Sequence, residues 1–445
     1  MWNLFRGKRR LTSAQIIMFG FLGAILVGAL LLSLPFATTS GHRAPFQDAL
    51  FTATSAVCVT GLIVRDTATY WSSFGQGVIL LLIQVGGMGV ITVAAAIAMI
   101  SGRKIGLMQR STMQEAISAP QVGGIVRLTG FILKATFGIE LIGAALLAPV
   151  FCRDFGPLRG LWMAVFHSVS AFCNAGFDLM GVRSPYSSLT AYEAQPVVNL
   201  VVVALIVIGG LGFLTWDDIR RNGWHFRRYR MQSKVILTVT AALVVLPAAY
   251  FFFLEFEDLP LKERIFCSLF QSVTPRTAGF NTADLTSLSE TGQWVLTALM
   301  LTGGSPGSTA GGMKTTTLAV LLLCAFSVFR RKSSPNVFGR RISDETVKNA
   351  ATIFILYITL FLLGGMIISR VEGLPMGACL FETASAIGTV GLTLGITPTL
   401  GGVSRLILMG LMFFGRVGGL TLIFAAVSGS GQQVSRLPQE KITVG

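Results

Sequence analysis

The sequence predicts an all-α membrane protein built from four pseudo-symmetric repeats, and three observations lead to this fold class. Of the 445 residues, 52% are hydrophobic and only 12% are charged, with a mean hydropathy of +0.70. A soluble domain carries roughly 25% charged residues. Apolar runs long enough to span a bilayer alternate with shorter amphipathic segments. A small polar peptide ending in glycine recurs four times.

The recurring peptide lies between two long apolar runs and follows a short segment that contains a phenylalanine. Its closing glycines are spaced 115, 103 and 112 residues apart. A period of this length indicates a repeated supersecondary unit rather than a short solenoid repeat. The four copies are TSAVCVTG at Thr54–Gly61, SAFCNAG at Ser170–Gly176, VTPRTAG at Val273–Gly279 and SAIGTVG at Ser385–Gly391.

Each repeat is predicted to contain a spanning helix (M1), a short pore helix, the recurring peptide and a second spanning helix (M2). The first M1, 14–36, covers about 35 Å and is stopped by Pro35. The segment 46–55 is too short to span, so it must enter and return. The other M1 helices are predicted at 125–151, 235–254 and 346–368. The remaining pore helices are predicted at 161–171, 263–274 and 376–385. The M2 helices are predicted at 74–100, 196–216, 294–329 and 406–428, which makes eight transmembrane helices.

The domain organisation follows from these elements. The predicted repeats are 14–101, 124–217, 232–330 and 345–428, with a basic leader at 1–13 and a tail at 429–445. Of the 35 Lys and Arg residues, 22 fall on the side of the leader and the tail, and 10 fall on the other side. The basic side is cytoplasmic by the positive-inside rule. We therefore expect a multi-pass protein of the cytoplasmic membrane with both termini inside. The net charge of +15 then reflects topology, and no nucleic-acid partner is expected.

The four peptides predict one central ion pore lined by backbone carbonyls. They carry few fixed charges, as expected for a site that holds a dehydrated monovalent cation by carbonyl dipoles. Such a lining needs alternating or positive φ, which glycine adopts readily. Four tight helix-packing turns are the alternative interpretation. The predicted filter residues are Val57, Cys58, Val59, Thr60, Gly61, Phe172, Cys173, Asn174, Ala175, Gly176, Arg276, Thr277, Ala278, Gly279, Ile387, Gly388, Thr389, Val390 and Gly391.

A second glycine-rich motif lies in each M2 segment. In three copies, 84–89, 208–212 and 415–420, the glycines are also consistent with a helix-packing face. In the third repeat the motif expands into 303–314, where five glycines and Pro306 exclude a continuous helix. This segment begins about 16 Å below the outer surface, near the midplane. A small polar loop at this depth must face water, so we interpret it as an intramembrane gate. A Walker A loop is excluded because Met313 precedes Lys314 and no strand leads in.

Arg416 lies about 15 Å into the fourth M2, where a charged side chain is costly and usually functional. Its expected partners are carbonyls and hydroxyls of the 303–314 loop. Snorkelling to the interface is the alternative for Arg416, and it is also an alternative for Lys314. The predicted gate residues are Gly303, Gly304, Ser305, Pro306, Gly307, Ser308, Thr309, Ala310, Gly311, Gly312, Lys314 and Arg416.

Other function classes fit the sequence less well. Six cysteines show no CxxC spacing and no histidine pattern, so neither a metal centre nor a disulfide framework is expected. An enzyme is disfavoured because there are only three histidines and no nucleophile–base pair at membrane depth. A secondary transporter with alternating access is the main alternative, since broken helices also mark that class. Four parallel copies around one axis favour a static pore.

These motifs resemble the Ktr/Trk/HKT superfamily of potassium transporters over nearly the full length, and most of all its KtrB-type membrane subunits. The four filter peptides, the loop at 303–314 and Arg416 carry the resemblance, although Pro306 replaces a residue that is usually small and polar. The resemblance implies K⁺ held by filter carbonyls, with Na⁺ as a candidate activating or coupled ion and no covalently bound cofactor. It further implies a homodimer in membrane lipid on a cytosolic RCK-type nucleotide-binding ring. Gly61 favours potassium over a sodium-conducting relative, and an M1 that starts by residue 14 favours Ktr.

Overall fold

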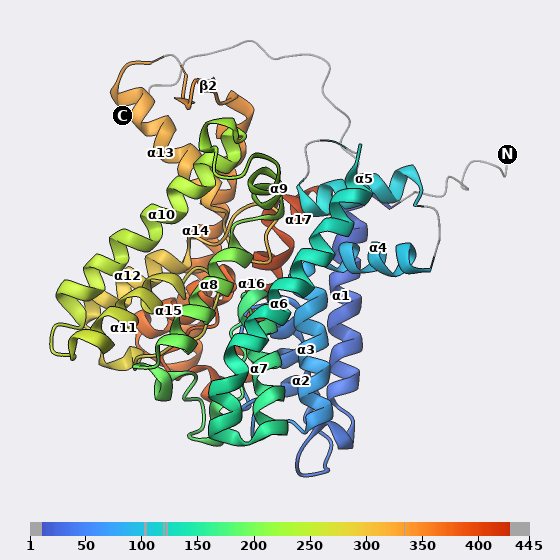
Figure 1. The fold of residues 1–445 in the computed structure, drawn as a ribbon, viewed down its shortest axis with the longest axis vertical. Helices are drawn as coiled ribbons and strands as arrows, with labels where there is room; N and C mark the ends of the chain where they lie inside the picture. Colours follow the sequence, from blue (N-terminus) through green and yellow to red (C-terminus); the bar gives the residue numbers. More distant parts are fainter. Residues whose placement is uncertain (1–10, 102–104, 119–120, 122, 333, 428–445) are drawn as a thin grey trace.

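The computed structural model describes residues 11–101, 105–118, 121, 123–332 and 334–427. Residues 1–10 of the predicted leader and the predicted tail at 429–445 lie outside this part. The described chain is almost entirely helical, and its helices lie side by side around a central region (Figure 1). Among the described residues the only strands are β1 (Asn336–Val337) and β2 (Arg340–Arg341), which form one small antiparallel hairpin.

Four helices are long and apolar enough to cross a membrane, and they fall where the four M1 helices are predicted. They are α1 (Ser13–Leu32), α6 (Ile125–Phe155), α10 (Met231–Tyr250, continued by a π-helical turn at Phe251–Glu255) and α14 (Asp344–Glu372). Capping side chains explain where α1 and α14 begin, and a glycine explains where α14 ends. Thr12 forms a capping box with Gln15, and Ser343 accepts from the Thr346 amide. Gly373, with φ of +69°, ends α14.

Four short helices match the predicted pore helices. They are α2 (Phe46–Val57), α7 (Pro157–Phe172), α11 (Leu261–Val273) and α15 (Met376–Gly388). The longest, α7, covers about 24 Å, which is less than the hydrocarbon core. Each packs on the long helix that precedes it, α2 on α1, α7 on α6, α11 on α10 and α15 on α14. Their aromatic anchors Phe51, Phe166, Phe270 and Phe381 are at most 1% exposed.

The predicted continuous M2 helices are wrong, because each is interrupted at a glycine. In the first, α3 (Ser73–Met88) and α4 (Val90–Ile100) meet at 97° around Gly89. In the second, α8 (Pro196–Gly210) and α9 (Phe213–Asn222) meet at 97° beside Gly212. In the fourth, α16 (Gly402–Val417) and α17 (Gly419–Val427) flank Gly418. These glycines have φ between 84° and 94°, which no α-helix interior accommodates.

In the third M2 the interruption is the predicted loop itself, between α12 (Glu290–Met300) and α13 (Thr315–Phe329). Within the described residues, length and composition identify four spanning helices, or six when the two sharply bent pairs count as one span each. The count of eight spans therefore stays a prediction.

Further elements connect the helices, and the sequence did not predict them. A helix α5 (Leu107–Ile117) lies in the connection that follows α4. Short 3₁₀ helices are η1 (Pro35–Ala37), η2 (Met180–Val182), η3 (Thr190–Tyr192), η4 (Phe226–Arg228), η6 (Leu285–Ser287) and η7 (Thr397–Thr399).

The short helices and the M2 segments close a ring. The M2 helix of each predicted repeat packs against the pore helix of the next, α3 on α7, α8 on α11, α12 on α15 and α16 back on α2. An ion pair supports the closure, because Asp48 at the start of α2 accepts from Arg405 of α16 at 2.8 Å. This arrangement brings the four recurring peptides together at the centre of the ring.

Candidate functional site

The four closing glycines contact one another in cyclic order around a common centre. A Cβ atom built on Gly61 would lie 2.5 Å from the Ala175 carbonyl oxygen and 3.1 Å from the Gly176 Cα. The same contact occurs at all four closing glycines: a Cβ on each would overlap the carbonyl oxygen of the residue that precedes another closing glycine. The four pairs are Gly61 with Ala175, Gly176 with Ala278, Gly279 with Val390 and Gly391 with Thr60. Only glycine fits at each position, because the backbone of the neighbouring peptide fills the space.

The backbone of all four peptides alternates in the same way. The closing glycines have φ between 68° and 96°. Two residues before each glycine, a non-glycine residue also has positive φ, between 52° and 65°; these are Val59, Asn174, Thr277 and Thr389. Non-glycine residues seldom adopt this conformation, and they do so mainly at functional sites. Alternation of this kind turns successive carbonyls toward one side, which a carbonyl-lined pathway requires.

Hydroxyl side chains at the ends of the pore helices hold these peptides. Ser55 Oγ accepts from the Gly61 amide at 3.1 Å, and Ser385 Oγ accepts from the Gly391 amide at 3.0 Å. Ser170 Oγ donates to the Phe177 carbonyl at 2.7 Å, and Thr274 Oγ1 donates to the Phe280 carbonyl. Sequence reasoning missed this role, although each copy of the peptide carries a Ser or Thr at this point.

No charged side chain of the four filter peptides lies at the centre that the closing glycines surround. The Arg276 side chain donates to Thr240 Oγ1 of α10 at 3.3 Å, so only its backbone can contribute to the predicted filter. The hydroxyl oxygens of Thr60, Thr277 and Thr389 are buried without a hydrogen-bond partner in the described structure. Unpaired buried oxygens are costly, and in native proteins an ordered water or an ion commonly supplies the missing partner. The predicted residues Val57, Phe172, Ile387 and Gly388 lie instead in the last turns of the pore helices.

The loop 303–314 lies directly against the inner end of the filter. Thr309 Oγ1 is 3.0 Å from the Phe172 carbonyl oxygen and 2.9 Å from Asn174 Oδ1. A Cβ built on Gly312 would lie 2.7 Å from the Gly388 carbonyl oxygen, and one built on Gly311 would overlap Thr389. The loop therefore touches the second and fourth filter peptides, and Pro306 lies outside these contacts.

Breaks in the other M2 helices provide hydrogen-bond partners for this loop. The Ser305 amide donates to the Gly210 carbonyl at 3.0 Å, and the Phe213 amide donates to the Gly307 carbonyl at 2.7 Å. On the other side, the Gly312 amide donates to the Gly415 carbonyl at 3.1 Å. A continuous helix would engage these backbone groups internally. The helix breaks and the loop thus form one hydrogen-bonded layer.

Arg416 joins this layer from the fourth M2. Its Nη1 donates to the Thr309 carbonyl of the loop, and its Nη2 donates to the carbonyls of Gly86 at 2.5 Å and Gly87 at 3.1 Å. Lys314 Nζ donates to the Ala310 carbonyl at 2.8 Å. Both cationic groups therefore bind the interior layer of carbonyls rather than extending to an interface.

A buried acidic group missed by the sequence analysis lies behind the second filter peptide. Glu140 of α6 is 5% exposed and accepts from Gln84 Nε2 at 3.0 and 3.2 Å. The sulfur of Cys173 lies 3.8 Å from the Glu140 carboxylate. The carboxylate thus fixes a filter residue and the helix α3 whose last carbonyls accept from Arg416. An acidic residue inside a spanning run was the available sequence signal.

Two separate cavities lie on opposite sides of the filter and the loop. The outer cavity, about 200 Å³, is lined by the four closing glycines and by Asp178, Tyr186 and Asp284. The inner cavity, about 210 Å³, is lined by Gly307, Ser308, Ala310, Lys314 and Arg416. The loop 303–314 lies between the four closing glycines, which line the outer cavity, and the inner cavity that it lines itself.

Asp178 gives the outer cavity a pH-dependent charge. It is partly buried in the loop after the second filter peptide, outside the membrane-spanning helices. Burial raises the pKa of its carboxyl to about 7; the hydrogen bond from the Met180 amide lowers this pKa, and the nearby Asp66 carboxylate contributes to raising it. The carboxyl is therefore neutral well below pH 7 and ionised well above it, when it attracts cations to the mouth.

We expect the apparent KM for cation uptake to be about two- to threefold lower at external pH 8 than at pH 6, because one nearby charge is gained. In Asp178→Asn, the apparent KM should stay at its higher value from pH 6 to pH 8. The control Asp284→Asn removes a carboxylate from the same cavity and should keep the pH step. Initial rates of rubidium uptake across this range measure both. A pH step that persists in Asp178→Asn would show that another group titrates.

The fold and this geometry define the class of the protein as a polytopic membrane transporter for cations, not an enzyme. The chain belongs to the TrkH family of cation transport proteins, whose family model, described as "TrkH: Cation transport protein", matches residues 25–436.

Several relatives share the full length of the chain. It is 40% identical to the potassium/sodium uptake protein NtpJ of Enterococcus hirae, over 99% of both chains. It is 38% identical to the Ktr system potassium uptake protein B of Bacillus subtilis, over 98% of this chain and 97% of the relative. The crystal structure of the potassium transporter TrkH from Vibrio parahaemolyticus has a similar fold. Its TM-score is 0.71 with 20% identity, over 94% of this chain and 86% of that one.

Proposed function

We propose that this chain takes up K⁺ across the cytoplasmic membrane through a filter of backbone carbonyls, and that the loop 303–314 gates the passage. The cyclic contact of the four closing glycines carries this proposal. It is supported by the positive φ values at matching positions and by the names of relatives described as potassium uptake proteins. The proposed architecture is four M1–pore helix–M2 repeats with eight spans and both termini in the cytoplasm.

The proposed filter consists of the carbonyls of Cys58–Gly61, Cys173–Gly176, Arg276–Gly279 and Thr389–Gly391, which follow the ends of the pore helices. Ions would be held between the closing glycines and the ring of Val59, Asn174, Thr277 and Thr389. The proposed gate is the loop with Arg416, because these groups occupy the layer between filter and inner cavity. Arg416 stabilises the closed arrangement by bonding three carbonyls that belong to two different M2 segments.

The proposed partners are a second copy of the chain and a cytosolic RCK-type nucleotide-binding ring, both implied by the resemblance to Ktr membrane subunits. Na⁺ is the proposed activating or coupled ion, which the name of the Enterococcus relative supports. The test is potassium uptake into a transport-deficient cell, with and without Na⁺ and with and without a co-expressed RCK subunit. Uptake of K⁺ that saturates without Na⁺ favours a pore. An obligatory, stoichiometric Na⁺ flux would favour an alternating-access symporter, and preferred Na⁺ uptake would indicate a sodium-conducting relative.

Replacing Arg416 with alanine should raise the leak flux. The substitution removes charge-assisted bonds to the Thr309 carbonyl and to the end of α3, each worth about 1.5–3 kcal/mol. Destabilising the closed loop by about 1.4 kcal/mol would raise the open fraction about tenfold. The matched control is Arg370→Ala, an exposed arginine in the last turn of α14. Rubidium flux into proteoliposomes without the RCK subunit measures the leak. If well-folded Arg416→Ala is no leakier than Arg370→Ala, Arg416 does not hold the gate closed.

A further inference from the structure

A cavity of about 780 Å³ lies away from the ion pathway, between α5, the start of α6 and α9. It is lined by five arginines and a single carboxylate: Arg110, Arg127, Arg220, Arg221, Arg230 and Asp217. The arginines come from four different elements, since Arg110 is on α5, Arg127 on α6, Arg220 and Arg221 on α9, and Arg230 caps α10. The folded chain therefore concentrates positive charge that is dispersed in the sequence.

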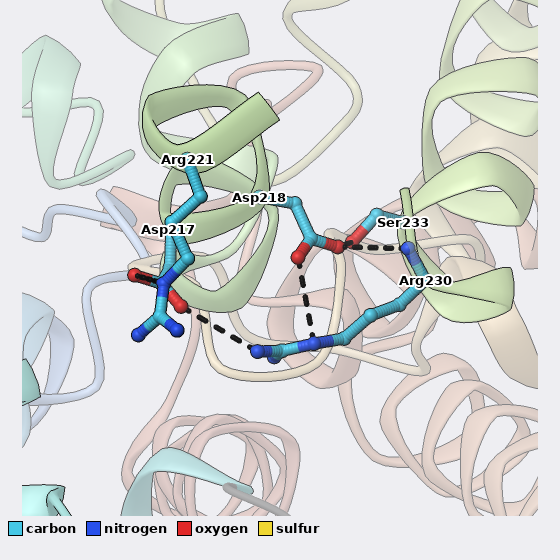
Figure 2. Close-up of polar contacts among 5 residues, drawn as sticks. All are labelled: Asp217, Asp218, Arg221, Arg230 and Ser233. Atoms are coloured by element: carbon cyan, nitrogen blue, oxygen red, sulfur yellow. Dashed lines mark hydrogen bonds and ion pairs between the residues drawn. The ribbon is translucent and has the colours of Figure 1, made fainter. Parts of the chain in front are cut away.

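The nearby carboxylates neutralise two of the five arginines. Asp217 accepts from Arg221 Nε at 2.8 Å and lies 3.5 Å from Arg230 Nη2. Asp218 accepts from the Arg230 amide at 3.1 Å and from Ser233 Oγ at 2.6 Å, and lies 3.4 Å from Arg230 Nε. Figure 2 shows these contacts, which fix Arg221 and Arg230 in place. Both aspartates are at most 5% exposed, so they lie beneath the arginines they hold.

The other three arginines have no acidic partner in the described part of the chain. Arg220 lies over the Phe131 ring, with its guanidinium carbon 4.7 Å from the ring centroid. Arg110 Nε donates to the Ile105 carbonyl at 3.1 Å, and among the described residues its terminal nitrogens have no hydrogen-bond acceptor. The first turn of α6, which begins at Ile125, also lines the cavity and adds the positive end of a helix dipole. Several forked donors around one cavity match the oxygens of a phosphate group.

The position of the cavity favours a lipid as the source of this phosphate. The cavity lies at the end of α6, a helix long enough to span the bilayer, where headgroups are found. Phe131 and Leu214 give it an apolar wall. Next to it, α4 turns by 97° from α3 and packs on α6, while its Ile97 and Ile100 are 61% and 87% exposed. Such a helix lies in the plane of the interface. Figure 1 shows α4 running crosswise to the direction of α1 and α3.

We propose that this cavity binds the phosphate of an anionic phospholipid, with the headgroup between Arg110, Arg127 and Arg220 and the acyl chains along α4 and α6. Basic pockets between helices at the cytoplasmic surface are a known class of headgroup site. The site is separate from the filter and the loop, so it holds independently of how the ion pathway works.

Native mass spectrometry of the purified full-length protein tests this site with phosphatidylglycerol, phosphatidylcholine and soluble glycerol phosphate as probes. Phosphatidylglycerol should be retained at least about tenfold better than phosphatidylcholine, and glycerol phosphate should not displace it at equal concentration. The double variant Arg127→Gln/Arg220→Gln should bind phosphatidylglycerol about 30-fold more weakly, at about 1 kcal/mol per arginine and a factor of ten per 1.4 kcal/mol.

The matched control is Arg227→Gln/Arg228→Gln, which removes the same charge from exposed arginines of η4 that do not line the cavity. The control should keep its affinity for phosphatidylglycerol within about threefold. Equal losses in the two double variants would show general surface attraction and overturn the site. Displacement by glycerol phosphate would show a free-anion site and overturn the lipid. If a variant fails to fold, equal retention of phosphatidylglycerol and phosphatidylcholine by the unaltered protein would still overturn the proposal.

Discussion

Gly61→Ser is expected to lower the K⁺/Na⁺ preference by about tenfold or more, which corresponds to about 1.4 kcal/mol at the ion site. A Cβ at residue 61 would lie 2.5 Å from the Ala175 carbonyl oxygen and 3.1 Å from the Gly176 Cα. Neither partner can give way without moving a carbonyl of the ring. The φ of +89° adds strain, because residues with a side chain avoid this conformation. The substitution therefore displaces two filter peptides at once.

Competition of K⁺ and Na⁺ against rubidium uptake measures this preference. The control is Gly373→Ser, which places the same side chain at a positive φ of +69° but meets no atom within 4 Å. It separates backbone strain from the contact with the neighbouring peptide. If Gly61→Ser and Gly373→Ser discriminate as well as the unaltered protein, the closing glycines do not form the filter.

Deleting Ser305–Ala310 is expected to raise the maximal uptake rate several-fold while leaving the ion preference intact. The deletion removes Thr309, whose side chain contacts the Phe172 carbonyl and whose own carbonyl accepts from Arg416. The shortened chain can close, because a Cβ on Gly304 would overlap that of Ala310, which places the two ends of the deleted segment side by side. The ring of glycines keeps its contacts.

This deletion also removes hydrogen bonds that hold neighbouring helices. The Gly210 carbonyl and the Phe213 amide would lose their partners in the loop, at about 0.5–1.5 kcal/mol each. Thr309→Val therefore accompanies it as a near-isosteric variant that keeps the loop backbone and loses only the hydroxyl. This variant should raise the rate by less than the deletion, with unchanged thermal stability within about 1 kcal/mol.

Much of the architecture was predictable because its signals are local or periodic. The length of apolar runs identified the four long helices, and the short segments ending in glycine identified the pore helices. The third M2 was predicted to break because Pro306 and five glycines allow no helix. The inward direction of the Arg416 side chain was predicted from the cost of exposing a charge to lipid at membrane depth.

The breaks in the other M2 helices were missed because glycine has two uses in a membrane helix. It permits close packing, and Gly86 does lie against the Val57 carbonyl. It also permits positive φ, as Gly89 does one turn later. Apolar periodicity does not distinguish these uses. Each of Gly89, Gly212 and Gly418 follows another glycine by three residues, and this repeated glycine pair was the signal that could have separated the two uses. The Glu140–Gln84 contact joins distant helices, so the sequence marks Glu140 as an acidic residue in a spanning run but does not indicate its partner.

Initial rubidium uptake into proteoliposomes, compared between the unaltered protein and the Ser305–Ala310 deletion, tests the central claim that a loop occludes a carbonyl filter. It is measured with and without the RCK subunit and nucleotide, and with competing Na⁺. The proposed gate predicts a higher maximal rate, weaker dependence on the RCK subunit and the same K⁺/Na⁺ preference. An unchanged or lower rate in well-folded protein, or an altered preference with no gain in rate, would contradict a gate and assign the loop a packing role.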